Sequence, residues 1–219
     1  MQPDPWERWS PLSGVAYVVL FVVALGVSSG PGDSPAEVAR YYADDGNRDR
    51  EVLVFFLIVA ATLAFLWFLG LLRSLFVRAE PEPARWTALG FAAGVTSAAC
   101  LLAASAAFVG PAFAAGEDEF TVDPNAWNVA SKVGSALLVC SVVAAALLVL
   151  ATSIVALRTR VLPRWTALTG FVVAAVMLFT IFLFPLFVWL AWVLAVSTIL
   201  VLRTARVAGW RRLGTNREG

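Results

Sequence analysis

The sequence predicts an all-α protein, a polytopic transmembrane helix bundle with six spans arranged as three helical hairpin repeats. Three observations lead to this fold class. Hydrophobic residues make up 60% of the chain and charged residues only 14%, whereas soluble domains carry roughly 25% charged residues. Long apolar runs follow one another, and a short phrase containing arginine and tryptophan opens three of them. We therefore expect a single integral membrane domain over residues 1–219.

The apolar runs have the length of membrane spans, since a hydrocarbon core of about 30 Å needs roughly 20 helical residues. The expected spans are about 12–28, 52–72, 86–109, 127–157, 165–183 and 186–202. The last apolar region is too long for one span, and its break is expected near Phe184-Pro185-Leu186 because proline interrupts a helix. One continuous kinked helix is the alternative. Arginines at both ends of this region favour the hairpin.

Charged residues are sorted between the two sets of connections. Arginines flank the second and fourth connections and follow the last span: Arg73, Arg78, Arg85, Arg158, Arg160, Arg164, Arg203, Arg206, Arg211 and Arg212. The opposite connections are acidic, although the first also contains Arg40, Arg48 and Arg50. Because short arginine-rich loops stay in the cytoplasm, both termini are expected there.

The first acidic connection is expected to contain a short helix over about 35–45. Ser34-Pro35-Ala36-Glu37 has the pattern of a capping box with proline at the first helical position. Tyr41 and Tyr42 follow at a spacing that suits an aromatic anchor at the membrane interface. The segment is interpreted as a connector lying on the outer surface, with a lid or a partner-docking element as the alternative.

A repeated phrase suggests internal duplication. Arg85-Trp86-Thr87-Ala88-Leu89 recurs as Arg164-Trp165-Thr166-Ala167-Leu168, and Arg8-Trp9-Ser10-Pro11-Leu12 is a looser copy. The ends of spans four and six match as well, in the segments 152–159 and 197–204. Convergence is the alternative, because tryptophan and arginine are favoured at any membrane interface.

Small residues predict which spans pack closely. Gly90, Gly94 and Ala98 form one ridge in span three, and a ridge ending at Gly134 continues in span four. We expect spans three and four at the centre and the aromatic-rich spans two, five and six facing lipid, although the ridges would also suit dimerisation. Cys100 and Cys140 are interpreted as small apolar fillers.

The chain lacks the residues of common catalytic sites. It contains no histidine, so the usual base of a hydrolytic triad and the HExxH motif of metalloproteases are absent. No glycine pattern for nucleotide binding occurs, and the acidic segment 117–123 lacks the spacing of a calcium loop. The span interiors hold serine and threonine but no Asp, Glu, Arg or His, which disfavours a proton-coupled transporter. We expect no enzyme activity, no cofactor and no metal.

The arginine-rich rim is the candidate binding surface, because clustered basic residues attract anionic lipid headgroups. The candidate headgroup contacts are Arg85, Trp86, Arg158, Arg164, Trp165, Arg203 and Arg206. Membrane lipids are therefore the expected partners, with a second copy of the chain or another membrane protein as further possibilities. No nucleic-acid partner is expected, since no basic face lies outside the membrane flanks.

The layout resembles a family of small six-span bacterial membrane proteins of unknown function, common in actinomycetes. The resemblance lies in Trp9-Ser10-Pro11-Leu12-Ser13-Gly14, Ser34-Pro35-Ala36-Glu37-Val38 and Leu162-Pro163-Arg164-Trp165. It implies a bacterial cytoplasmic-membrane location and supplies no catalytic residues. The sequence thus predicts a non-enzymatic multi-pass protein, acting as a scaffold, a lipid-interacting protein or an accessory subunit. A transporter or channel for a small uncharged or apolar solute is the alternative.

Overall fold

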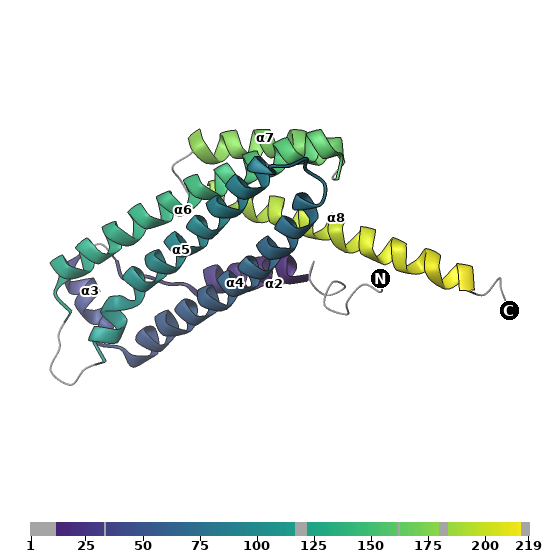
Figure 1. Ribbon diagram of the computed structural model, residues 1–219. Coiled ribbons are helices and arrows are strands. Elements are labelled where there is room, and N and C mark those ends of the chain that lie inside the picture. Colours follow the sequence, from purple (N-terminus) through teal and green to yellow (C-terminus); the bar gives the residue numbers. More distant parts are fainter. Residues whose placement is uncertain (1–11, 33, 117–121, 162, 180–183, 216–219) are drawn as a thin grey trace.

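The computed structural model describes residues 12–32, 34–116, 122–161, 163–179 and 184–215, without the side chains of 179, 184, 185 and 203–215 (Figure 1). The described part of the chain is all-α and contains no strand. Its helices are α2 (Leu12–Val27), α3 (Pro35–Tyr42), α4 (Asp45–Val77), α5 (Arg85–Ala114), α6 (Pro124–Thr159), α7 (Arg164–Phe179) and α8 (Phe184–Thr215). The looser first copy of the repeated phrase, Arg8-Trp9-Ser10-Pro11, lies outside the described residues.

Three of the described helices are long and apolar enough to cross a membrane, namely α4, α5 and α6. At about 1.5 Å per residue, each exceeds the thickness of a bilayer core of about 30 Å. The apolar parts of the other three are shorter and cover Leu12–Val27, Arg164–Leu178 and Leu186–Leu202. The structure is therefore compatible with a membrane location.

The observed helix boundaries differ from the predicted spans where a cap sets them. Helix α4 begins at Asp45 and not near residue 52, because the Asp44 side chain accepts a hydrogen bond from the Gly46 backbone N–H at 2.8 Å. Two separate helices replace the long apolar region, as predicted. Phe184, Pro185 and Leu186, where the break was expected, belong to the first turn of α8, where proline is tolerated. Residues 180–183 are outside the described set.

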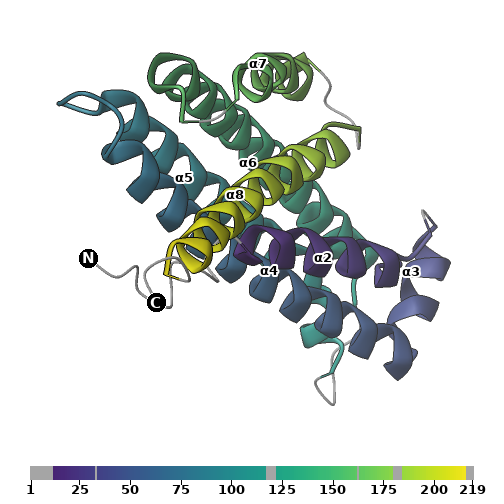
Figure 2. The same ribbon diagram turned by 90° about the vertical axis from the view of Figure 1, so that its right-hand side faces the viewer.

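The six helices other than α3 form a closed ring, in which each packs against the next along the chain and α8 returns to α2. Figure 2 shows α8 passing between α7 and α2. Consecutive helices alternate in direction (Figure 1). We call the end of the bundle with residues 78–84, 160–161 and 163 the arginine end, and the end with α3 and residues 28–32, 34, 115–116 and 122–123 the acidic end.

Helices α5 and α6 form the closest antiparallel pair, as predicted. Gly90 lies against Ala151, and Ser97 contacts Ser141. Gly94 has a different role from the one predicted, because a Cβ placed there would meet the Leu69 methyl groups of α4 at 2.6 Å. The two glycines of α5 therefore pack against different helices, Gly90 against α6 and Gly94 against α4.

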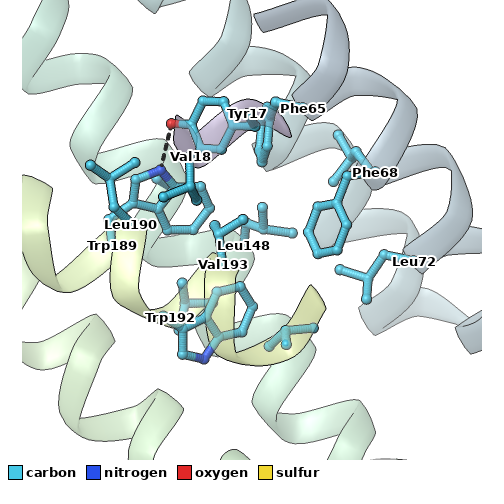
Figure 3. Packing of buried hydrophobic residues seen from close by; sticks show 14 of the residues in the cluster. Tyr17, Val18, Phe65, Phe68, Leu72, Leu148, Trp189, Leu190, Trp192 and Val193 are labelled. Carbon is cyan, nitrogen blue, oxygen red and sulfur yellow. Dashed lines mark hydrogen bonds between the residues drawn. The ribbon is translucent and has the colours of Figure 1, made fainter. Parts of the chain in front are cut away.

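The expectation that aromatic side chains face lipid is wrong for the centre of the bundle. Phe65, Phe68, Trp189 and Trp192 are each at most 5% exposed. Figure 3 shows these side chains and Tyr17 gathered between α2, α4 and α8. Helices α4 and α8 also have aromatic residues on their outer faces, and these remain at the surface, such as Trp67 at 58% and Phe187 at 52% exposure.

The short helix α3 forms as predicted and packs onto the acidic end. The Glu37 backbone N–H donates to Ser34 Oγ at 3.3 Å and the Ser34 backbone N–H donates to Glu37 Oε2 at 3.2 Å, which completes the capping box. Val38 and Tyr42 are buried against Val109 of α5. The helix ends at Tyr42, short of residue 45, because Asp44 starts the next one.

Candidate functional site

The structure brings together two of the predicted headgroup contacts at the arginine end. The Arg158 guanidinium carbon lies 5.7 Å from the centre of the Trp86 ring. This distance is within the range of a cation–π contact. Arg85 and Arg164 are exposed nearby on their own helices, and Trp165 is 56% exposed. The side chains of Arg203 and Arg206 lie outside the described set.

Glu80 organises this end, although the sequence does not single it out. It accepts hydrogen bonds from the backbone N–H groups of Trp86 at 3.2 Å and Thr87 at 2.9 Å, and from the Thr87 hydroxyl at 2.6 Å. Ala84, at the cap position of α5, has φ 41° and offers no side-chain acceptor. Glu80 therefore supplies the missing cap for α5.

The electrostatics of Glu80 reflect this capping role. Burial would raise the pKa of its carboxyl group, but the hydrogen bonds from Thr87 and Trp86 and the charge of Arg158 together hold it below the ordinary value. The carboxylate thus partly balances the arginine charge where the repeated phrase begins. The connection contains two acids, Glu80 and Glu82, between Arg78 and Arg85, and the sequence alone does not show which of them caps α5.

Only a small void lies beneath the Trp86 ring. Its volume is about 10 Å³, and Thr87, Gly90 and Thr152 contribute to its lining. This is room for about one water molecule. The hydroxyl of Thr152 is buried without a protein partner, so a single water there would satisfy it. This void is too small for a ligand, so a molecule that binds at the arginine end would contact its surface.

The acidic end contains a much larger cavity, inside the ring of helices. Its volume is about 380 Å³, within the range of small-molecule sites. Most of the lining is apolar and comes from α2, α4, α5, α6 and the start of α8. The lining residues are Phe21, Leu25, Ser28, Ser29, Gly30, Pro31, Tyr42, Glu51, Val54, Phe55, Ile58, Leu101, Ala104, Ser105, Phe108, Val109, Trp127, Ser131, Leu138 and Leu186.

The polar lining residues gather around Glu51 near α3. The Tyr42 hydroxyl donates to the Glu51 carboxylate, at 3.2 Å to Oε1 and 3.3 Å to Oε2. The Tyr41 hydroxyl donates to the Ser29 carbonyl oxygen at 2.9 Å, which ties α3 to the end of α2. Burial raises the pKa of Glu51 to about 7, against the opposing effect of the tyrosine hydrogen bonds.

The cavity narrows toward the arginine end and closes at a layer of hydrogen bonds. A smaller void of about 20 Å³ shares Phe21, Leu101, Leu138 and Leu186 with it. Tyr17 and Trp189 line this void, and the Trp189 Nε1–H donates to the Tyr17 hydroxyl at 2.9 Å (Figure 3). The Ser141 hydroxyl donates to the Ser97 carbonyl oxygen at 2.9 Å in the same lining.

Glu51 belongs by sequence to the first acidic connection, and the sequence analysis does not predict its place in the cavity. A signal was present, because Glu51, Val54, Phe55 and Ile58 follow the spacing of one helix face and all four line the cavity. Among the described residues, no group of three or more acidic or cysteine side chains is placed to hold a metal ion. Comparisons of the chain with protein-family models, curated proteins and solved structures find no match.

Proposed function

We propose that this chain is a non-enzymatic six-span membrane protein that holds an apolar or amphipathic molecule, such as a membrane lipid, at its acidic end. The observation that carries the proposal is the cavity of about 380 Å³ with its largely apolar lining. An apolar cavity of this size favours a ligand with hydrocarbon surface, because burying such surface yields about 25 cal/mol per Å².

The surfaces of the shorter helices support six spans. Large apolar side chains face outward on α2 (Val19, Val22 and Val23), on α7 (Leu168 and Val172) and on α8 (Phe187 and Leu202). Contiguous apolar surface of this kind suits lipid contact. A helix of 16 residues rises about 24 Å, and tryptophan and arginine flanks or local thinning of the bilayer compensate for the difference.

The three-hairpin repeat is supported by matched environments. Thr152 and Ser197 occupy equivalent positions in the matched segments 152–159 and 197–204, and both hydroxyls are buried without a protein partner. Their neighbours Ser153 and Thr198 both donate to the carbonyl oxygen four residues earlier, although Ser153 is buried and Thr198 is exposed. The shared burial of Thr152 and Ser197 is therefore the feature that supports the repeat.

The arginine end is proposed to face the cytoplasm, with both termini on that side of a bacterial cytoplasmic membrane. Its arginines would contact anionic headgroups, and the Trp86–Arg158 contact lies on this surface. The protein would thus touch lipid at both ends in different ways. A role as a scaffold or an accessory subunit is compatible with the same surfaces.

A transporter for a small apolar solute is the second candidate. The cavity reaches the acidic end but closes at the Tyr17–Trp189 layer, and a carrier caught open to one side has this shape. Transport would require a second state in which that layer opens. Solute flux into liposomes distinguishes a carrier from a binding protein.

Native mass spectrometry of protein gently extracted from its own membrane tests the proposal. We expect a reproducible extra mass on the wild type. Ala104 lines the cavity and is 1% exposed, so Ala104→Phe should fill the space and remove that mass. Ala103→Phe is the matched control, because Ala103 is the exposed neighbour on the same helix. An unliganded wild type, or an unchanged mass on Ala104→Phe, would contradict the proposal.

A further inference from the structure

Among the residues that the structure describes, Glu51 is the one acid in the lining of the cavity, and no basic residue contributes to that lining. A carboxylate has about four lone-pair positions for hydrogen-bond donors. The hydroxyl of Tyr42 occupies one side at 3.2–3.3 Å, and Tyr41 adds a weaker interaction. Acceptor capacity therefore remains on a charged group at an apolar cavity.

The two nearest arginines in sequence are engaged elsewhere. Arg50 donates to Ser29 Oγ at 3.2 Å. Arg48 donates to the Tyr42 carbonyl oxygen at 2.9 Å and pairs with Asp45. Within the described residues, Arg48–Asp45 is the only ion pair. Glu51 thus lacks the cation that a partly buried carboxylate usually has.

Aromatic side chains surround the same region. Tyr42, Phe55, Phe108 and Trp127 all contribute to the cavity lining. Aromatic rings together with a carboxylate are the groups that proteins use to bind ammonium ions, because each ring face is electron-rich. The rest of the described lining accepts hydrocarbon and contains no cationic side chain for an anionic headgroup.

From this arrangement we infer that the occupant of the cavity is an amphiphile carrying one ammonium group, which binds Glu51 while its apolar body fills the space between the helices. The inference rests on the proposed function, since it names the ligand class of the same cavity. The ammonium belongs either to a free hydrophobic amine or to the headgroup of an aminophospholipid. Both present the same chemistry to Glu51.

Binding of a permanently charged ammonium should depend on pH through Glu51. The pKa of Glu51 is about 7 because of burial, so the carboxylate is mostly ionised above that pH and mostly protonated below it. The titratable groups facing it are Tyr41 and Tyr42 of α3, whose pKa values are also raised by burial. The described lining residues from α2, α5, α6 and α8 are uncharged, and Arg48 and Arg50 of α4 contact other groups.

The test measures equilibrium binding of a radiolabelled decyltrimethylammonium ion to the full chain in nanodiscs of an uncharged glycolipid. Its carbon isostere, in which a carbon atom replaces the quaternary nitrogen, is the uncharged comparison. We expect the cation to bind about tenfold more tightly than the isostere at pH 8.5. The preference should shrink as the pH falls through 7, because the cation itself does not titrate.

Glu51→Gln should abolish this preference and leave the binding of the isostere unchanged. Asp49→Asn is the matched control, because Asp49 is exposed on the same helix and does not line the cavity. It removes the same charge from the acidic end and should keep the preference. If Glu51→Gln does not fold, the pH dependence of the wild-type preference decides the question.

Each outcome separates the inference from the proposed function. Equal binding of cation and isostere to the wild type, or a preference that ignores pH, would overturn the ammonium inference alone. Failure of both probes to bind would overturn the proposed function as well. Adding phosphatidylethanolamine to the nanodiscs distinguishes the two sources of the ammonium group. If the natural occupant is an aminophospholipid, the added lipid should displace the probe. If it is a free amine, the added lipid should not change probe binding.

Discussion

The hydrogen bond between Tyr17 and Trp189 allows a quantitative test of how the bundle closes beneath its cavity. Both side chains are almost fully buried, at 3% and 4% exposure, and the N–H···O distance is 2.9 Å. Tyr17→Phe leaves the indole N–H without an acceptor, and an unpaired buried polar group costs about 1–3 kcal/mol. Trp189→Phe removes the donor and also leaves a void next to Phe65.

A double-mutant cycle separates the bond from the lost packing. In the double variant neither polar partner remains, so its loss of stability should be smaller than the sum of the single losses. Interhelical hydrogen bonds in membrane proteins couple by about 0.6 kcal/mol on average and at most about 1.7. We expect a coupling energy near this upper limit, because both side chains are buried and the void that they line measures only about 20 Å³.

The assay is reversible unfolding by SDS in mixed micelles, followed by circular dichroism. Tyr17→Phe, Trp189→Phe and the double variant are measured with the wild type under the same conditions. A coupling energy within about 0.3 kcal/mol of zero would refute the reasoning. The two side chains would then contribute only through packing.

Three further predictions concern other parts of the molecule. Gly94→Ala should lower the free energy of unfolding by about 1–3 kcal/mol, because its Cβ would lie 2.6 Å from the Leu69 methyl groups. Gly70→Ala is the control: its Cβ would enter open space, so it should be neutral or slightly stabilising in the same SDS titration. Equal effects of the two substitutions would contradict this prediction. Glu80→Ala should cost about 1 kcal/mol by removing the cap of α5. The pKa of Glu80 in the folded protein is lowered, so its contribution to folding stability is present above about pH 4.3 and is lost as the pH falls toward that lowered pKa. Identical acid melting curves of the wild type and the Glu80→Ala variant would contradict this prediction. For Glu51 the sign is opposite: its folded pKa is about 7, so stability without ligand is greatest below about pH 4.3 and declines until about pH 7. Melting temperatures of Glu51→Gln should lack this decline, and a persisting decline would assign it to another group.

The sequence predicted the helices well because the apolar runs, the capping box and the proline carry local signals. The break before Pro185 and the helix that starts at Pro35 both follow from residues within one turn. The burial of Phe65 and Trp189 was not predictable in this way. An aromatic residue is favourable both against lipid and in a core, so only the closure of the ring decides its place.

The candidate site was predicted less well, because its parts come from distant segments. Trp86 and Arg158 meet as a consequence of the α5–α6 packing, and Glu80 shares its connection with a second acid, Glu82. Glu51 precedes span two directly, so composition assigned it to the solvated loop. Its burial depends on α3 folding back over the cavity through Tyr41 and Tyr42, a tertiary contact with no local signature.

The distribution of the repeated residues explains why the two ends of the bundle differ in chemistry. The matched phrases at 85–89, 164–168, 152–159 and 197–204 all lie toward the arginine end. Their proposed roles are anchoring at the membrane interface and close helix packing, which each of the proposed hairpins would need. At the acidic end the hairpins have different sequences, and only the first contributes α3 with the tyrosines that bind Glu51. A binding site needs such asymmetry, because equivalent hairpins would place the same group several times around the ring and offer no single charge to orient a ligand. Substitutions at the arginine end should therefore change stability and insertion, whereas substitutions around Glu51 should change what the protein binds.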